Sequence, residues 1–390
     1  MSIPLKYGCN PHQVPATLQA VTDHLPLRIV NGVPGYINIL DALGAWQLVH
    51  ELSHATGQPS AASFKHTSPA GAAIASAALS EAFRSAHMMP DMALSPVAIA
   101  YARARAGDRV CSYGDAVAVS HEVDESLARL LDREVSDLII APAYTPVALD
   151  ILKRKKKGGY LILQMDPEYE PPTMETREIF GLALQQRRNT AVITRDTFGR
   201  MMTPDGSLPE DVLQTLMVGT IALKYTQSNS VCVAYDGQVI GMGAGQQSRI
   251  HCTRLACDKA DKWLLQLHPR VREAQFHKGA KRVDKFNLID QYLSWDQLSG
   301  TEEQAMRAGF HTPPVPLTKA ERHDWIRSFQ GLCLCSDAFI PFRDNIDRAS
   351  RTNVQYVAQT GGGLRDAEVT AAAQQYGMTM IHTGVRLFAH

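Results

Sequence analysis

Apolar and polar positions along the chain alternate between strand-like runs and helical stripes. Residues 42–55 predict an amphipathic helix, because apolar side chains recur there at helical spacing. Short continuous apolar runs at residues 61–64, 137–141 and 160–164 predict buried strands. Strands that alternate with helices in this way indicate an α/β fold. The helical stripe consists of Leu43, Ala45, Trp46, Val49 and Leu52.

The second half of the chain continues this alternation. A proline and two acidic residues within 208–211 are typical of the first turn of a helix. Asp236 and Gly237 between two apolar runs predict a tight β-hairpin. A strand at 355–358, a loop of three glycines, a helix and a strand at 378–381 predict a further β-loop-α-β unit.

We expect the chain to divide into two α/β subdomains, residues 1–190 and 191–390, each with its own sheet. The acidic, proline-rich segment 167–172 is the best boundary near the middle of the chain. Residues from about 253 to 327 have a mostly helical pattern, which we interpret as an insertion in the second subdomain. With 390 residues, 45% of them hydrophobic, the chain can bury a core of this size.

Charge and cysteine content change the picture by excluding classes of function. The 39 basic and 39 acidic residues balance, so the chain has no overall attraction for nucleic acid or an anionic membrane. No apolar run approaches the roughly 20 residues that a membrane helix needs, and no signal peptide is visible. The seven cysteines form no C-x-x-C pair, which is typical of free thiols in a reducing compartment. We therefore expect a cytoplasmic protein.

One generic motif suggests a metal site. His50, Glu51 and His54 match H-E-x-x-H, in which two histidines on one helix face hold zinc and the glutamate acts as base. Ser60 stands where the extended motif needs a third histidine. The three residues also lie opposite the apolar stripe, which favours a solvated helix face. A zinc hydrolase remains an alternative hypothesis.

Two further local patterns leave alternatives open. The basic run from Lys153 to Lys157 is typical of a solvated helix end, and it could also attract an acidic ligand tail. Gly241, Gly243 and Gly245 follow a predicted strand with G-x-G-x-G spacing, which differs from the dinucleotide-binding motif. These glycines could make a tight turn or bring backbone amides close to a ligand.

Candidate chemistry lies directly after the predicted strand at 61–64. Lys65 offers a cation for an anion or a developing charge, and His66 titrates near neutral pH. Strand ends are where α/β folds place their reactive groups. The segment 336–345 mixes aromatic and charged residues in a way that packing alone rarely requires. On pattern alone, ordinary polar residues at a strand end are the favoured explanation of Lys65 and His66, and the same holds for segment 336–345.

Taken together, these segments resemble the formyltransferase domain of a bifunctional purine-biosynthesis enzyme whose other half is an inosinate cyclohydrolase. Each matching stretch is long and unusual in composition, and the stretches follow one another in the family's order. They are residues 6–13, 63–71, 112–115, 134–137, 224–232, 241–254, 336–345 and 386–390.

The resemblance implies transfer of a formyl group from 10-formyl-tetrahydrofolate to the 5-amino group of 5-aminoimidazole-4-carboxamide ribonucleotide (AICAR). That amine is a poor nucleophile, so the reaction needs a base, positioning and stabilisation of an oxyanion. By the family's pattern His66 is the base, and Lys65 stabilises the developing charge and assists departure of the folate nitrogen. Asn229 donates a hydrogen bond at the reacting centre.

The resemblance also implies binding residues for both substrates. The phosphate of the nucleotide is expected at Lys6, Tyr7 and Arg386. The rest of the nucleotide site is expected to contain Gly114, Asp137, Arg249 and Phe339. The folate is expected to contact Ile250, Asp344, Gly363 and Leu364.

At the level of fold, the resemblance implies two cytidine-deaminase-like α/β subdomains with a mostly helical insertion. The deaminase zinc signature is missing from this sequence, so the implied chemistry needs no metal. The family implies an intertwined homodimer with active sites shared between subunits, and no nucleic-acid or membrane partner.

Two departures from the family pattern bear on function. The cyclohydrolase domain of roughly 200 residues has no counterpart in this sequence, so we expect a stand-alone formyltransferase. Lys6 stands where the family usually has arginine, and lysine binds phosphate as a point charge rather than through a planar fork. Both departures also motivate the alternative of a non-catalytic relative that only binds the nucleotide.

Overall fold

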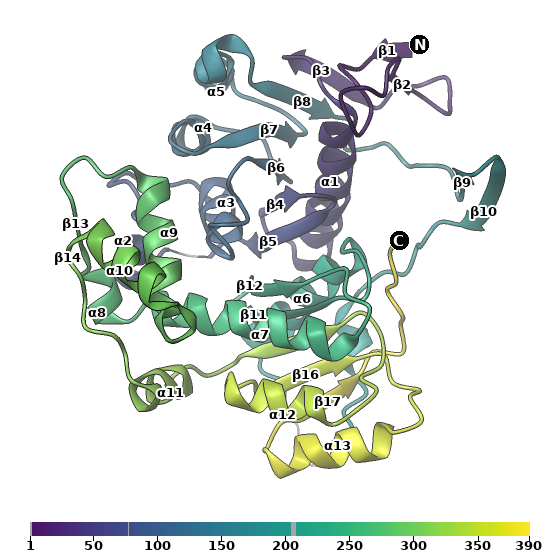
Figure 1. Cartoon of the computed structure of the whole chain (residues 1–390). Helices are drawn as coiled ribbons and strands as arrows, with labels where there is room; N and C mark the ends of the chain where they lie inside the picture. The colour runs from purple at the N-terminus through teal and green to yellow at the C-terminus, as the bar shows by residue number, and fades with distance from the viewer. Residues whose placement is uncertain (1, 77, 204–207) are drawn as a thin grey trace.

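The computed structural model describes residues 2–76, 78–203 and 208–390. Within these residues the centre of the molecule is a mixed eleven-stranded sheet of order β17-β16-β15-β11-β12-β5-β4-β6-β7-β8-β3 (Figure 1). Its strands are β3 (Leu27–Asn31), β4 (Ser60–Lys65), β5 (Ser68–Ile74), β6 (Asp115–Val119), β7 (Ser136–Ala141), β8 (Leu161–Met165), β11 (Val231–Tyr235), β12 (Gln238–Gly243), β15 (Cys333–Ser336), β16 (Tyr356–Gln359) and β17 (Thr379–His382).

The two halves of this sheet repeat one topology. In the first half β4 pairs antiparallel with β5 and β6, and β7 and β8 follow in parallel. In the second half β11 pairs antiparallel with β12 and β15, and β16 and β17 follow in parallel. The inner strands of the halves pair antiparallel, Gln238 of β12 with Ala73 of β5. The expectation of a separate sheet in each half was therefore wrong, because this pairing makes one continuous sheet.

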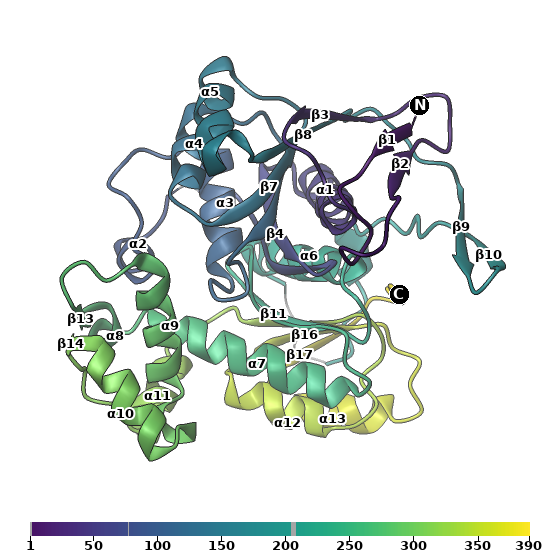
Figure 2. The same cartoon turned by 45° about the horizontal axis from the view of Figure 1, so that its top comes forward.

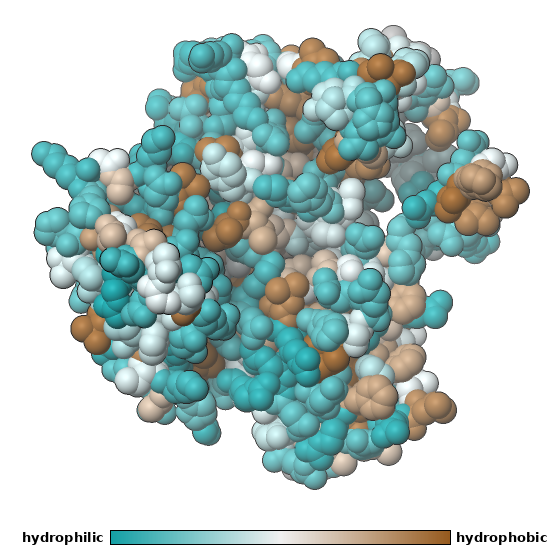
Figure 3. All heavy atoms as spheres, viewed as in Figure 1, coloured by the Kyte–Doolittle hydropathy of each residue, from teal (hydrophilic) through white to brown (hydrophobic). Residues whose placement is uncertain are grey.

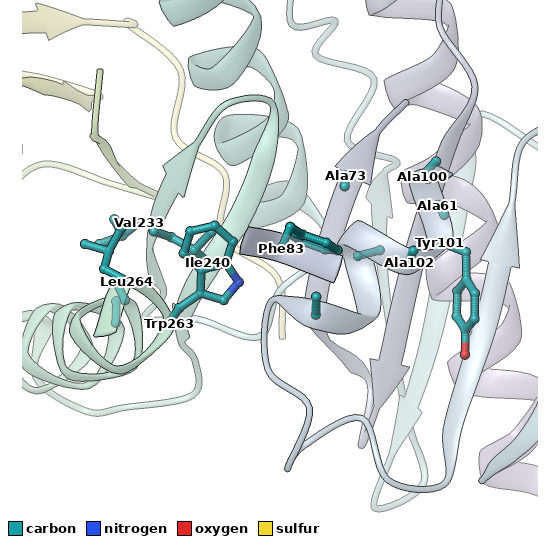
Figure 4. Close-up of a cluster of buried hydrophobic side chains, with 14 of the residues drawn as sticks. Ala61, Ala73, Phe83, Ala100, Tyr101, Ala102, Val233, Ile240, Trp263 and Leu264 are labelled. Carbon is teal, nitrogen blue, oxygen red and sulfur yellow. The ribbon is translucent and has the colours of Figure 1, made fainter. Parts of the chain in front are cut away.

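Helices cover both faces of the sheet. Helices α1 and α6 pack on one face and contact each other, whereas α3, α4, α5, α7, α12 and α13 lie on the other (Figures 1 and 2). The core on the second face runs through both halves: Figure 4 shows Phe83 between Ile240 and Trp263 of the second half and Ala73 of the first half. The helices are α1 (Tyr36–Thr56), α2 (Glu81–Ala86), α3 (Pro96–Ala106), α4 (Glu125–Asp132), α5 (Pro146–Arg154), α6 (Glu210–Lys224), α7 (Arg249–Gln266), α12 (Asp344–Arg351) and α13 (Asp366–Gln375).

Most elements expected from the sequence are present. The amphipathic helix is α1, which begins six residues before the predicted start, and its apolar stripe is buried apart from half-buried Leu43. The three predicted strands are β4, β7 and β8. Asp236 and Gly237 form the two-residue turn between β11 and β12 with φ of 48° and 67°. A mixed α/β fold is confirmed, whereas the likeness to cytidine deaminases and the boundary at residue 190 stay predictions.

The helical insertion begins later than the sequence suggested. Residues 253–266 belong to α7, which packs directly on β11 and β12. The polar residues of α7 made it look like part of a peripheral segment. The insertion itself follows α7 and lies beside α2 of the first half (Figure 2). It contains α8 (Pro269–Arg272), β13 (Gln275–Phe276), α9 (Arg282–Leu293), α10 (Gly300–Gly309), β14 (Phe310–Thr312) and α11 (Lys319–Arg327).

A buried ion cluster fastens this insertion to the first half. The Glu134 carboxylate, 8% exposed, pairs with Arg105 and Arg109 at 3.2 Å each and with Arg282 of α9. Burial alone would raise the pKa of Glu134, but Arg109, Arg105 and Arg282 outweigh it and lower the pKa to about 2. The Arg109 guanidinium also lies 4.7 Å from the centre of the Phe286 ring.

Besides the β13–β14 pair of the insertion, two short ribbons of the described residues lie outside the main sheet. Strands β1 (Ser2–Pro4) and β2 (Thr17–Gln19) pair near the start of α1, and β9 (Met174–Ile179) and β10 (Leu182–Arg187) form a projecting hairpin. This hairpin, which we call the arm, carries exposed apolar side chains such as Phe180 and Leu182 (Figures 1 and 3). Among the helices in the described part of the chain, none is long and apolar enough to cross a bilayer.

We expect Glu134→Gln to lower the free energy of unfolding by about 3–5 kcal/mol at neutral pH, because it leaves buried arginines without their partner. Since the pKa of folded Glu134 lies below its ordinary value of 4.5, its ionic stabilisation is complete above that pH and is lost as the pH falls towards 2. The difference from wild type in urea unfolding should therefore narrow below about pH 4.5.

The control is Glu303→Gln, which breaks the exposed pair with Arg307 and should change stability by less than about 1 kcal/mol. Equal effects of the two substitutions, or a gap that does not depend on pH, would contradict the assigned role of Glu134.

Candidate functional site

The Lys65–His66 pair lies at the tip of the β4–β5 hairpin. Strand β4 ends at Lys65, β5 begins at Ser68, and His66 and Thr67 form the two-residue turn. Both turn residues are left-handed, with φ of 52° and 59°, a conformation that such turns usually obtain from asparagine or glycine. The turn exposes the imidazole of His66. It is held by Asp41 of α1, whose Oδ1 accepts the backbone N–H of Thr67 at 2.7 Å.

Three expected site residues surround this tip within the first half. The ammonium of Lys65 donates to the carbonyl of Tyr113. The next residue, Gly114, has φ of 77°, and a Cβ there would lie 3.7 Å from the carboxylate of Asp137. Asp137 in turn pairs with Lys156 at 2.5 Å. The structure thus brings Lys65, Gly114 and Asp137 together at one end of β4, β6 and β7.

A buried polar chain lies beneath this group. Ser63 of β4 donates to Asp115 at 2.7 Å, and Asp115 pairs with Arg105 at 2.7 Å. Arg105 continues to Glu134 and so to the insertion. The strand that ends in Lys65 is therefore tied to the same ion cluster that fastens the helical insertion.

Lys6 and Tyr7 lie at the start of α1. The backbone N–H of Lys6 donates to Pro34, and the carbonyl of Tyr7 accepts from Tyr36, the first residue of α1. Both side chains are exposed. The first six residues of α1 therefore contact both regions. Tyr36 bonds to the segment expected to bind phosphate, and Asp41 bonds to the His66 turn.

A second group forms around Asn229 in the other half. The Asn229 amide donates to the carbonyl oxygens of Gln246 at 2.9 Å and Gln247 at 3.2 Å, and its Oδ1 accepts from Arg249 at 2.8 Å. Arg249 is buried and pairs with Asp337. Arg249 thus holds the Asn229 side chain in place from below.

Close packing of backbone positions the first turn of α7, which contains Arg249 and Ile250. A Cβ on Gly241 would lie 2.1 Å from the carbonyl oxygen of Ala256, and one on Gly243 would lie 2.2 Å from that of Cys252. These glycines therefore let α7 approach β12 more closely than any side chain allows. Gly241 and Gly243 lie within β12 and not in a tight turn, and their close neighbour is a helix. Approach of backbone amides to a ligand stays a prediction.

The remaining expected residues extend this second group. Gly363 packs against the ring of Phe339, since a Cβ there would lie 2.9 Å from Phe339 Cδ2. Leu364 is fully exposed, and Asp344 begins α12. The guanidinium of Arg386 lies over the Phe388 ring, and the neighbouring Leu387 N–H donates to Asp337.

The two groups approach each other at the β5–β12 junction. The backbone N–H of Gln227 donates to Ser68 Oγ at 3.4 Å, which places the loop before Asn229 beside the hairpin tip. Within residues 2–76, 78–203 and 208–390, however, no hydrogen bond joins His66 to Asn229. Each group is assembled inside its own half, and the contact between them is confined to the loop.

The H-E-x-x-H residues make a structural contact. Glu51 Oε2 pairs with Lys224 at 2.7 Å and accepts from the Tyr225 hydroxyl at 2.5 Å. His54 bonds to the carbonyl of His50 at 2.8 Å. The described residues contain no group of His, Cys, Asp and Glu arranged to hold a metal ion. The expectation of a solvated face was wrong for Glu51, because its partners lie 173 and 174 residues away and no local pattern shows them.

Sequence reasoning missed three side chains that the structure places at these groups. They are Asp41, Asp337 and Lys156. Asp41 could have been noticed as an acid four residues before Ala45 of the apolar stripe. Lys156 belongs to the basic run that we interpreted as solvated, and it stays exposed while pairing with Asp137. Within that run the half-buried residue is Lys155, which donates to the carbonyl of Glu134.

Comparison with known proteins gives one family. A model described as the AICARFT/IMPCHase bienzyme matches residues 2–259. The chain is 28% identical over 394 residues to the bifunctional purine biosynthesis protein PurH of Sorangium cellulosum, covering 99% of this chain and 58% of that protein. It is 27% identical over 390 residues to the protein of the same name from Roseobacter denitrificans, covering 99% and 59%. The chain therefore spans less than two thirds of the length of these relatives.

The packing of α7 on β12 leads to a stability test. We expect Gly241→Ala to lower the free energy of unfolding by about 1–3 kcal/mol, because the new methyl group must displace the backbone of α7. Urea unfolding would measure this change. Gly300→Ala is the control, since an added Cβ there meets nothing within 4 Å and should change stability by no more than about 1 kcal/mol. Similar values for both variants would show that α7 has room to shift.

Proposed function

The chain belongs to the AICARFT/IMPCHase bienzyme family, and on that premise we propose that it transfers a formyl group from 10-formyl-tetrahydrofolate to the 5-amino group of AICAR. Relatives in this family are enzymes of purine biosynthesis, and the family depends on folate. The observation that carries the proposal is the Lys65–His66 pair at an exposed hairpin tip, directly beside the loop that leads to Asn229.

We assign a separate role in the reaction to each of the residues at and beside this tip. In the proposed reaction the AICAR amine attacks the formyl carbon, a new C–N bond forms, and the C–N10 bond of the folate breaks. The exposed imidazole of His66 accepts the proton that the amine loses. The ammonium of Lys65 stabilises the oxyanion of the tetrahedral intermediate and favours protonation of the departing N10. Asn229, whose Oδ1 is held by Arg249, donates to the reacting centre when one of its two amide hydrogens is released from the carbonyl of Gln246 or Gln247.

The substrates are proposed to bind on opposite sides of this tip. Lys6, Tyr7 and Arg386 offer exposed groups for the nucleotide phosphate, and Gly114, Asp137 and Phe339 line the rest of the nucleotide site. The exposed loop with Gly363 and Leu364, together with Ile250 and Asp344, is proposed to receive the folate. Lys6 gives a single charged contact to phosphate where a guanidinium would give two.

We also propose that the protein works as a homodimer with shared sites. The arm supports this, because its apolar side chains project away from the body of the chain (Figure 3). Phe180 is fully exposed, and Leu182 is 69% exposed. An exposed apolar surface of this kind is typical of a contact with another protein, and a second copy of this chain is the occupant that we propose.

The catalytic proposal predicts that His66→Ala lowers kcat about 100-fold or more, because the reaction loses its base. The rate is followed as tetrahydrofolate forms from AICAR and 10-formyl-tetrahydrofolate. His54→Ala is the matched control: this exposed histidine of the H-E-x-x-H motif should be dispensable. An equal loss of activity in His54→Ala would show that the effect is not specific to His66, and a wild-type chain that binds AICAR without turnover would favour the non-catalytic relative.

The dimer proposal predicts that Phe180→Asp combined with Leu182→Asp halves the mass in solution measured by light scattering, because two charges oppose burial of the arm. Gln185→Asp adds a charge to the same hairpin at a polar position and should leave the mass unchanged. A monomeric wild-type chain, or a double variant of unchanged mass, would refute a dimer held by the arm.

A further inference from the structure

We infer that Asp41 is a positioning residue for the proposed base: its carboxylate fixes the His66–Thr67 turn and thereby the place of the His66 imidazole. The inference rests on the proposed formyl transfer and names a residue that acts through the turn rather than on the substrate.

Asp41 is buried in an unusual way for a carboxylate. Its side chain is 7% exposed and reaches from α1 to the hairpin tip. It takes part in none of the ion pairs formed by the described residues. Burial raises its pKa, and the backbone N–H groups of Thr67 and His66 and the nearby imidazole oppose that effect. A buried acid without a cationic partner lowers stability unless its hydrogen bonds compensate. The backbone of the turn provides them.

The His66–Thr67 turn needs a stabilising contact because neither of its residues favours the conformation that it adopts. His66 and Thr67 both adopt left-handed φ values, which are unfavourable for a residue with a Cβ. Asparagine and glycine would form the turn more readily. The hydrogen bond from the Thr67 N–H to Asp41 offsets part of this cost. The His66–Thr67 turn, whose residue types are unfavourable for its conformation, is thus stabilised by a hydrogen bond to helix α1.

The second half of the sheet contains the corresponding hydrogen bond, but its turn has no lysine or histidine. In the β11–β12 turn the second residue, Gly237, donates its N–H to Thr215 Oγ1 at 2.9 Å. Thr215 is the sixth residue of α6, as Asp41 is the sixth residue of α1. The same contact therefore occurs in both halves. In each, the backbone N–H of the second turn residue donates to the side chain of the sixth residue of the helix, α1 or α6. A carboxylate occurs only in the half whose turn presents Lys65 and His66.

Helix α1 also relates the turn to the expected phosphate group. Tyr36 at its first residue bonds to Tyr7, and Asp41 follows five residues later, about 7–8 Å along the axis. One rigid helix thus sets the separation between the Lys6–Tyr7 segment and the His66 turn. Loss of the Asp41 contact would leave the nucleotide bound while its amine and the imidazole no longer align.

The test compares Asp41→Ala with Asp41→Asn and Asp41→Thr. Asparagine keeps an acceptor oxygen, and threonine copies the contact of the second half. In Asp41→Ala we expect hydrogen exchange of the Thr67 amide to become about 10-fold faster or more. We also expect kcat to fall about 100-fold while KM for AICAR stays within about threefold, because alignment is lost rather than binding. Asn and Thr should restore slow exchange and most of kcat.

A control on the same helix separates positioning from general loss of stability. Glu51→Gln breaks the pair with Lys224 without touching the hairpin turn, so it should lower stability and leave kcat unchanged. If Asp41→Ala folds poorly, Thr67→Gly in the same chain relieves the left-handed turn and should recover folding and part of kcat.

Each outcome decides the inference. Unchanged exchange of the Thr67 amide in Asp41→Ala would overturn it, as would faster exchange with kcat unaffected. Restored exchange without restored kcat in Asp41→Asn and Asp41→Thr would show that the charge matters rather than the position, and would also overturn it. If the wild-type chain transfers no formyl group, the proposed function fails, whereas the exchange measurement still tests the contact.

Discussion

The arrangement of this molecule depends on a contact between backbones where the two halves of the sheet join. Gly71 of β5 and Gly107 after α3 meet there: a Cβ on Gly71 would lie 2.1 Å from the carbonyl of Ala104, and one on Gly107 would lie 2.4 Å from that of Val239 in β12. Only glycine permits this approach. Because it sets β5 against β12, it also sets the His66 turn against the loop before Asn229.

The antiparallel junction places the two central hairpin turns at opposite ends of the sheet. The Asp236–Gly237 turn lies against Ile74 and is closed by Arg103, whose guanidinium pairs with Asp236 at 3.0 Å. The His66–Thr67 turn lies open, with its side chains exposed. One scaffold thus supplies a turn that is sealed by its neighbour and a turn that is free to meet a ligand.

Local pattern was enough to predict strands such as β4, β7 and β8 and the helices α1 and α6, because burial against the sheet produces continuous apolar runs and helical stripes in the sequence. Strands such as β5, β6 and β15 were not predicted. The turn at Asp236–Gly237 was equally readable from its residue types. The β5–β12 pairing was not, because edge pairing between distant strands leaves no local mark. The contacts of Glu51 and Asp41 escaped for the same reason. The start of the helical insertion was placed too early, inside α7, because the polar positions of α7 resemble those of a peripheral helix. The roles assigned to His66, Lys65 and Asn229 came from family resemblance and stay predictions.

The repeated topology has a consequence for how the chain folds during synthesis. All the strands of the first half are synthesised, and leave the ribosome, before β11 and β12. Until β12 arrives, β5 is the open border of a nearly complete sheet, rich in alanine and able to pair with any passing strand. The nascent first half is therefore an aggregation-prone species, and the rate at which the second half emerges limits how long that border stays uncovered.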